Sequence, residues 1–152
     1  MPGARILLVE DDEVLRGLLV SNLEVRGHEV RSAASVQQAL DILRGFTCDL
    51  VILDINLPDR TGWDFLRTAC QQGLLRPREV ESEAPRLPVV VLSAVRVSIQ
   101  RLSEFRPLAY LPKPFPMEAL LRLAAQAASR SSASIEQEYE EEAGRSPVNT
   151  AM

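Results

Sequence analysis

The only lysine of the chain, Lys113, lies between two prolines in the stretch LPKPF at residues 111–115. The other cationic residues of this 152-residue sequence are all arginine. A lysine ammonium is a compact point charge on a flexible stem, so it can reach a single phosphoryl oxygen that a wide planar guanidinium fits less well. The stretch alone is equally compatible with an ordinary surface lysine in a turn. Its meaning therefore depends on the residues that the fold places beside it.

Acidic side chains follow two apolar runs of the sequence. Glu10, Asp11 and Asp12 come directly after RILLV, and Asp54 ends DLVILD. Carboxylates gathered in one site repel one another unless a cation lies among them, and Mg²⁺ favours oxygen ligands from carboxylates, water and phosphate. An aspartate can also be the nucleophile that forms an aspartyl-phosphate. These residue types predict a magnesium site where Asp54 can receive a phosphoryl group and where Mg²⁺ and Lys113 stabilise its charge.

Strand-like runs alternate with helix-like runs up to residue 128. The strand candidates are residues 5–10, 28–33, 49–54, 88–93 and 108–112. This alternation predicts an α/β fold: a five-stranded, doubly wound parallel sheet in the flavodoxin-like order 2-1-3-4-5, with helices on both faces. Ligands of such sheets bind outside the carboxyl ends of the strands. We therefore expect Ser93, which ends the fourth strand, and Lys113, which follows the fifth, to lie near Asp54.

Two segments fit this alternation poorly. Residues 73–87 form a long, charged, proline-containing connection before the fourth strand, and loops of this length are usually functional or mobile. Residues 129–152 change to a serine-rich linker followed by the acidic stretch IEQEYEEEAG. We expect residues 1–128 to form one domain and residues 129–152 a flexible acidic tail. A partner-binding arm, or the beginning of an absent output domain, is the alternative for the tail.

The composition disfavours several classes of protein. The net charge is −4, 17 cations are outnumbered by 21 carboxylates, and no basic run is present, so we expect no direct binding to nucleic acid. The longest apolar stretch is too short to cross a bilayer, which indicates a cytoplasmic protein without membrane attachment. Cys48 and Cys70 have no CxxC or histidine companion, so buried, reduced thiols are expected.

Taken together, the motifs resemble the receiver domain of the bacterial two-component response-regulator family over about residues 4–128. The matching motifs are EDD after the first strand, DINLPDRTG with Asp54, Pro58 and Gly62 in the family's D-x-x-x-P-x-x-x-G pattern, Ser93-Ala94, and Tyr110 with Lys113-Pro114-Phe115. Each motif is weak alone. Their shared order on the matching elements carries the resemblance.

The resemblance implies a metal and phosphate site. Asp54 resembles the phosphoacceptor and Asp11 the direct ligand of Mg²⁺, with Glu10 acting through water. Asn56 matches the position whose backbone carbonyl ligates the metal. Asp12 is expected to be a helix N-cap instead of a ligand.

It also implies a conformational switch. Ser93 resembles the hydroxyl that hydrogen-bonds the phosphoryl group, Lys113 the cation that contacts it, and Tyr110 the aromatic residue that moves inward when the hydroxyl shifts. The Lys113-Pro114 bond resembles the family's cis peptide. A phosphate adds about −1.5 to −2 charges, which can shift the population of a two-state domain.

The sequence departs from the family pattern in two regions. The insertion at 73–87 is longer than usual, and the stretch from Val95 to Leu108 is shortened and lacks the usual Gly-Ala turn. That stretch belongs to the surface where family members dimerise or dock partners, so a homodimer remains one of the alternatives for the oligomeric state. Val95 replaces a residue that is often polar; we hypothesise that it restricts attacking water and prolongs the phosphorylated state.

Other functions remain as alternatives. An unphosphorylated, receiver-like interaction scaffold has the same residues, because a site can be present without being used. An Asp-nucleophile phosphatase of the haloacid dehalogenase type needs a second aspartate two residues after the first, where this chain has Asn56, which cannot transfer the proton. A flavodoxin-like cofactor binder needs a phosphate loop after the first strand, where EDDEVL would repel phosphate.

The resemblance implies a single-domain response regulator in two-component signalling. A sensor histidine kinase or a phosphotransfer protein would supply the phosphoryl group, and an unknown effector protein would read the switch. Such a receiver is a phosphoacceptor module and not a conventional enzyme, although it assists its own phosphorylation and dephosphorylation. His28 opens a strand without the helical bundle of a phosphorelay histidine, so we expect an ordinary strand histidine.

Overall fold

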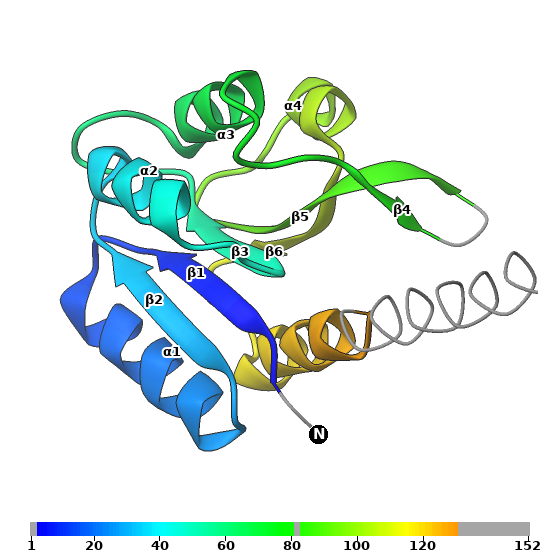
Figure 1. The fold of residues 1–152 in the computed structure, drawn as a ribbon. Coiled ribbons are helices and arrows are strands. Elements are labelled where there is room, and N and C mark those ends of the chain that lie inside the picture. Colours follow the sequence, from blue (N-terminus) through cyan, green and yellow to red (C-terminus); the bar gives the residue numbers. More distant parts are fainter. Residues whose placement is uncertain (1–2, 81–82, 131–152) are drawn as a thin grey trace, which may run out of the picture.

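The computed structural model describes residues 3–80 and 83–130, which form a sheet covered by helices on both faces (Figure 1). Its strands are β1 (Arg5–Val9), β2 (Glu29–Ala33), β3 (Leu50–Asp54), β4 (Arg78–Val80), β5 (Glu83–Ser93) and β6 (Pro107–Pro112). Its helices are α1 (Glu13–Val25), α2 (Val36–Gly45), α3 (Gly62–Gln71), α4 (Ile99–Phe105) and a final helix over residues 117–130.

Five of the strands run parallel in the order β2-β1-β3-β5-β6, so the predicted doubly wound topology is confirmed. The fourth and fifth predicted strands are β5 and β6. β3 is buried along its whole length because it lies in the centre of the sheet with helices on both sides. Asp54 pairs with Leu92 of β5, which places Ser93 at the same edge of the sheet as Asp54.

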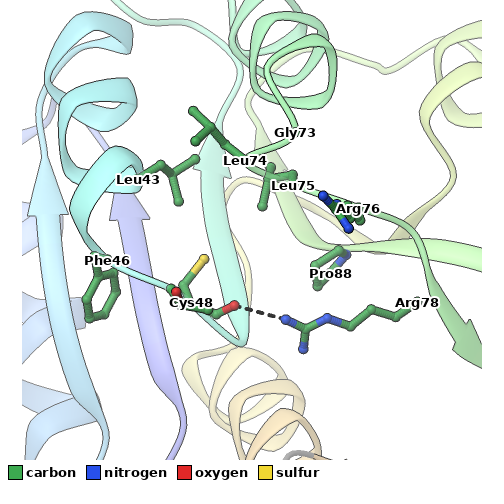
Figure 2. A pocket seen from close by; sticks show the side chains of 10 residues that line it. Leu43, Phe46, Cys48, Gly73, Leu74, Leu75, Arg76, Arg78 and Pro88 are labelled. Carbon is green, nitrogen blue, oxygen red and sulfur yellow. Dashed lines mark hydrogen bonds between the residues drawn. The ribbon is translucent and has the colours of Figure 1, made fainter.

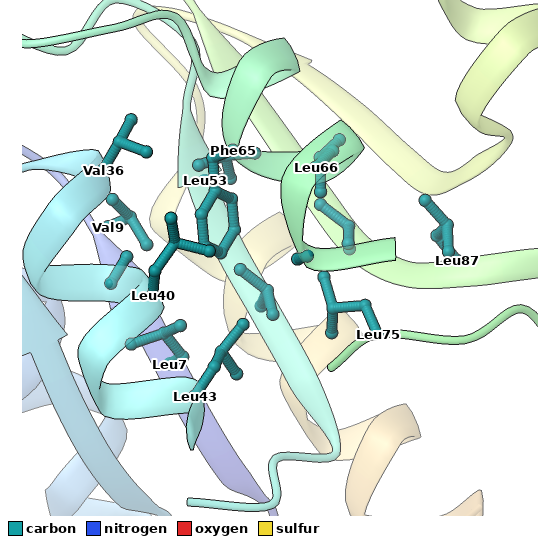
Figure 3. Packing of buried hydrophobic residues seen from close by; sticks show 14 of the residues in the cluster. Leu7, Val9, Val36, Leu40, Leu43, Leu53, Phe65, Leu66, Leu75 and Leu87 are labelled. Atoms are coloured by element: carbon teal, nitrogen blue, oxygen red, sulfur yellow. The ribbon is translucent and has the colours of Figure 1, made fainter. Parts of the chain in front are cut away.

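Each face of the sheet has its own hydrophobic core. On one face, α2 and α3 bury residues such as Leu40 and Phe65 against Leu53 of β3 (Figure 3). On the other face, α1 and the final helix bury Leu19 and Leu120. Each fully buried side chain of this size contributes about 1.5–3 kcal/mol of transfer free energy, so the two cores fasten the helices to the sheet.

Side-chain caps fix where the helices begin. The N-caps of α1, α2, α3 and α4 each accept a hydrogen bond from the amide three residues on; they are Asp12, Ser35, Thr61 and Ser98. The expected N-cap role of Asp12 is therefore confirmed. Such a cap contributes about 1 kcal/mol.

The connection predicted at 73–87 is in large part a β-hairpin, so its interpretation as an irregular loop is wrong. β4 pairs antiparallel with the early part of β5, which begins at Glu83 instead of residue 88. β4 and the early part of β5 carry charged and exposed side chains without apolar alternation, so no periodic pattern marks them as strands. Backbone hydrogen bonds between the two strands hold this extension together, since it buries no apolar face of its own.

Arg78 ties the hairpin to the beginning of β3. Its guanidinium donates to the carbonyl of Cys48 at 3.0 Å and to that of Asp49 at 3.2 Å. These two carbonyls precede the first residue of β3, so the inserted hairpin extends the sheet at the end opposite Asp54.

The structure also tests the expectations for the two cysteines, for His28 and for the Lys113-Pro114 peptide. Cys48 and Cys70 are free thiols as predicted; Cys48 is buried, which raises its pKa to about 11, but Cys70 is only half-buried. His28 is a buried structural residue whose Nδ1 accepts a hydrogen bond from the amide of Ala4 at 2.9 Å. The Lys113-Pro114 peptide is cis.

The described part of the chain contains no helix that is both long and apolar enough to cross a membrane. Most of the expected acidic tail, residues 131–152, lies outside the described residues.

Candidate functional site

The ammonium of Lys113 lies between two buried carboxylates. Its Nζ is 2.9 Å from Glu10 Oε2 and 3.3 Å from Asp54 Oδ2. Glu10 follows β1, Asp54 ends β3, and Lys113 follows β6. The parallel sheet therefore brings these three residues together from distant parts of the sequence. The backbone amide of Lys113 also donates to the carbonyl of Ser93 at 2.8 Å, which continues the β5–β6 pairing. The sheet therefore positions this lysine, and the reading of an ordinary surface lysine does not hold.

Asp11 joins the two carboxylates that contact this ammonium in a cluster of three. Oxygens of Glu10, Asp11 and Asp54 lie within 4.8 Å of one another. Glu10 and Asp54 are buried, while Asp11 is exposed. The backbone amide of Asn56 donates to Asp54 Oδ1 at 3.1 Å, so this residue also lies at the site. A group of hard oxygen donors that is open on one side fits Mg²⁺, which keeps part of its water shell.

The charges of this cluster shift one another. The pKa of Glu10 is raised from 4.5 to about 7, because burial and the nearby Asp54 carboxylate raise it by more than the Lys113 ammonium and the Asp12 amide lower it. Partial burial lowers the pKa of Lys113, but the hydrogen bond and charge of Glu10, together with Asp54, outweigh it and raise the pKa overall. Lys113 therefore stays cationic at neutral pH. Glu10 has a pKa near neutral pH, so a bound cation would favour its ionised form.

The loop that carries the acidic residues is held by contacts that the sequence analysis missed. The amide of Asp12 donates to Glu10 Oε1 at 3.2 Å. Arg16 of α1 donates from Nη1 to the carbonyl of Glu10 at 2.9 Å and to that of Asp11 at 3.4 Å. The only sequence signal for this contact is a cation about one helical turn after the N-cap Asp12.

Gly62 lets the first turn of α3 approach the end of β3. A Cβ at this position would lie 2.9 Å from the backbone carbonyl of Asp54 and 3.0 Å from the Cα of Ile55, closer than real side chains approach. The amide of Gly62 donates to the carbonyl of Ile55 at 2.8 Å. A glycine here therefore has a packing reason, because any side chain would push α3 away from Asp54.

Ser93 and Tyr110 meet at a backbone carbonyl beside the cluster. The buried Ser93 hydroxyl donates to the carbonyl of Val95 at 2.7 Å and accepts from the Val95 amide at 3.1 Å. The half-buried Tyr110 donates its hydroxyl to the same carbonyl at 3.3 Å. Among the contacts of the described residues, the Ser93 hydroxyl makes no hydrogen bond to Asp54. The predicted residues therefore form two adjoining groups: the carboxylates with Lys113, and the hydroxyls that share the Val95 carbonyl.

Known proteins resemble the chain in sequence and in structure. It is 38% identical over 126 residues to the response regulator protein FleR of Pseudomonas aeruginosa, which covers 82% of this chain and 24% of that protein. It is 33% identical over 129 residues to the DNA-binding transcriptional regulator NtrC of Bradyrhizobium, covering 84% of this chain and 25% of that protein. The chain thus spans about a quarter of the length of these two relatives.

A solved structure and a family sequence model both match this chain. The chemotaxis response regulator CheY4 of Vibrio cholerae superposes with a TM-score of 0.67 at 25% identity, covering 82% of this chain and 98% of that structure. The sequence model of the response regulator receiver domain matches residues 6–125, which include the acidic loop, Asp54, Ser93 and Lys113. The chain belongs to the response regulator receiver domain family.

Proposed function

We propose that this receiver is a phosphoacceptor module in which Asp54 takes a phosphoryl group from a histidine kinase or a histidine-containing phosphotransfer protein. The observation that carries the proposal is the Lys113 ammonium, which lies 3.3 Å from Asp54 Oδ2 at the end of β3. In this reaction an Asp54 oxygen attacks phosphorus. The phosphorus–nitrogen bond of the phosphohistidine breaks, and the imidazole nitrogen keeps the electron pair.

The carboxylate cluster supplies the metal site of the proposal. Asp11, Asp54 and the backbone carbonyl of Asn56 would hold Mg²⁺ directly and Glu10 through water; this assignment rests on the family resemblance and on the clustering of the three carboxylates. When bound, Mg²⁺ neutralises charge on the oxygens of the phosphoryl group. Lys113 contacts one of those oxygens, so the chain assists its own phosphorylation and hydrolysis without being a conventional enzyme.

Ser93 and Tyr110 supply the switch. The Ser93 hydroxyl has one proton, which it donates to the Val95 carbonyl in this structure. Donation to a phosphoryl oxygen on Asp54 requires that bond to break, which leaves Tyr110 as the side-chain donor to the Val95 carbonyl. Phosphorylation therefore changes the backbone around Val95, and an effector protein reads that change.

The output of the chain is proposed to be a protein contact. The receiver unit is residues 1–128, followed by the acidic segment 129–152. Residues 1–130 contain 16 of the 17 cations and 16 of the 21 carboxylates, so this part has no net positive charge to attract a nucleic acid backbone. The name of the NtrC relative describes a DNA-binding regulator of about four times this length, and we do not transfer that activity to this chain.

Intact-mass measurement tests the proposal. The protein is incubated with Mg²⁺ and a small-molecule phosphodonor, and we expect the gain of one acid-stable, base-labile phosphate. Asp54→Ala should gain none, and Lys113→Arg should gain it at least about tenfold more slowly, because the planar guanidinium does not fit the same oxygen. Asp59→Ala is the matched control, because Asp59 is an aspartate in the same loop whose carboxylate bonds α2 instead of Lys113.

Two results would redirect the assignment. If the wild-type protein binds Mg²⁺ but gains no phosphate, the unphosphorylated scaffold becomes the better function. If the protein instead hydrolyses the phosphodonor through Asp54 without accumulating a phosphorylated mass, it is a phosphatase and not a signalling receiver.

A further inference from the structure

A cavity of about 380 Å³ opens at the end of the sheet opposite Asp54 (Figure 2). Its apolar part comes from the end of α2, from the segment after α3 and from β5; it consists of Leu43, Phe46, Leu74, Leu75 and Pro88. Arg76 and Arg78 lie on the side of the cavity toward β4. The site thus combines an apolar floor with two guanidinium groups, and its volume lies near the lower limit of about 300–1,000 Å³ that is usual for ligand pockets.

The two guanidinium groups have no carboxylate partner among the described residues. Arg76 is exposed and makes no hydrogen bond or ion pair within residues 3–80 and 83–130. Arg78 donates only to the backbone carbonyls of Cys48 and Asp49. Elsewhere in the described chain, the exposed Arg5 and Arg44 are paired with acidic side chains, whereas the exposed Arg60 and Arg96 have no ion pair. The cavity therefore suits a ligand that is both apolar and acidic.

The chain carries such a ligand in its own sequence. Residues 131–152 contain five of the 21 acidic residues and one of the 17 cations, which accounts for the whole net charge of −4. The acidic residues are concentrated in the segment 135–142, IEQEYEEE, where Tyr139 lies between Glu138 and Glu140. An aromatic ring flanked by carboxylates complements an apolar floor flanked by guanidinium groups.

The geometry allows this segment to reach the cavity. The final helix begins four residues after Lys113, which lies at the Asp54 edge, and it belongs to the same hydrophobic cluster as Ala4, which precedes β1. The orange end of the final helix lies toward the side of the sheet where β5 begins, which is also the cavity's end (Figure 1). The nine residues from 130 to Tyr139 span up to about 30 Å. This length suffices to pass around the sheet edge, since each layer of the sandwich is about 10 Å thick.

We propose that the cavity binds residues 135–142 of the same chain, with Tyr139 on the apolar floor and the adjacent glutamates against Arg76 and Arg78. Docking within one chain needs little intrinsic affinity because the linker keeps the segment at a high effective concentration. The receiver thus carries a second binding site at the end of the sheet opposite the phosphoacceptor. This proposal does not depend on phosphorylation of Asp54.

Reciprocal NMR measurements on the full chain test the docking. In ¹⁵N-labelled protein, the replacement of Glu138, Glu140, Glu141 and Glu142 by Gln should shift the amide signals of residues 46–48 and 74–78. Arg76→Glu should shift the amide signal of Tyr139, which lies far from residue 76 in sequence. The combination Arg76→Glu with Glu140→Arg should return the Tyr139 signal toward its wild-type position.

An arginine outside the cavity provides the control for Arg76→Glu. Arg26→Glu alters an exposed arginine at the end of α1, at the same end of the sheet but outside the cavity, and should leave the Tyr139 signal unchanged. The proposal fails if Arg26→Glu moves that signal as much as Arg76→Glu does, or if neither set of reciprocal shifts appears. It also fails if the shifts fade on roughly tenfold dilution, because the segment would then occupy the cavity of a second copy. The same shifts in Asp54→Ala would keep the result separate from phosphotransfer.

Discussion

The carboxylate of Asp59 lies 2.9 Å from the amide of Val36 and accepts its hydrogen bond, which caps the first turn of α2 from a loop 23 residues away in sequence. Its second oxygen accepts the amide of Gln37 at 3.1 Å. Asp59 belongs to the loop between β3 and α3, the same loop that begins at the proposed phosphoacceptor. A cap for one helix is thus built into the loop of the site.

We expect Asp59→Ala to lower the free energy of unfolding by about 1 kcal/mol, the usual cost of a lost N-terminal cap. Asp41→Ala serves as the control, since it removes only exposed contacts, an ion pair with Arg44 and a hydrogen bond from Gln37, and should cost less than about 0.5 kcal/mol. Slight burial acts to raise the pKa of Asp59, but the Val36 and Gln37 amides lower it overall. The difference between wild type and Asp59→Ala should therefore shrink as the pH falls below the usual pKa of an aspartate. Urea unfolding at several pH values measures both effects, and equal losses for the two variants would contradict the capping role.

Glu10 should give the metal-free protein an unusual pH dependence. Its folded pKa of about 7 lies above the ordinary value of 4.5, so between these values the folded state binds more protons than the unfolded state. The contribution of Glu10 to the free energy of unfolding must then fall as the pH rises from about 4.5 to about 7. Mg²⁺ favours the ionised carboxylate and should remove this loss.

Comparison with Glu10→Gln isolates this effect in urea unfolding with a chelator. His28 contributes with the opposite sign, because burial lowers its pKa and its neutral form is favoured as the pH rises. Only the difference between wild type and Glu10→Gln is therefore informative. If the free energy of unfolding changes with pH in the same way for both proteins, burial does not raise the pKa of Glu10.

Gly62→Ala should destabilise the fold by about 1–3 kcal/mol, because the new methyl group would overlap the backbone carbonyl of Asp54. Gly17→Ala is the matched control: it lies inside α1 with no atom within 4 Å of the added carbon, so it should stabilise the protein by about 0.5–1 kcal/mol. Thermal or urea unfolding measures both changes. A neutral effect at Gly62 would mean that α3 can shift freely against β3.

Val95→Glu should shorten the lifetime of the phosphorylated state. Val95 is 57% exposed and apolar beside Ser93, and a carboxylate there can orient an attacking water. Ile99→Glu is the control, because Ile99 is also exposed and apolar but lies in the first turn of α4. The decay of the phosphorylated mass after removal of the phosphodonor measures the lifetime. Unchanged decay in Val95→Glu would count against a role of Val95 in restricting water.

The parallel core and the meeting of Glu10, Asp54 and Lys113 could be predicted because both depend on topology. Buried strands have a strong apolar signal, and parallel strands bring their carboxyl ends to one edge whatever the details of packing. The roles assigned to the individual site residues stay predictions until phosphate and metal binding are measured.

Other features could not be predicted because they depend on which side chain reaches which backbone group. Arg16 on the acidic loop, Asp59 on α2 and Arg78 on the residues before β3 all donate to or accept from the main chain. Such contacts leave no periodic pattern in the sequence. The β4 hairpin was missed for the same reason, since its pairing involves backbone groups under charged side chains.

Glu10 and Lys113 are in contact although 103 residues separate them along the chain. The two ends of this span cannot meet until the last strand of the sheet has left the ribosome and docked beside β5, since non-local pairings form late in folding. A nascent or partly unfolded chain therefore presents Asp54 without its ammonium partner. The phosphotransfer proposed for Asp54 would in this way be restricted to chains that have finished folding, and an incomplete product of translation would not react with a phosphodonor.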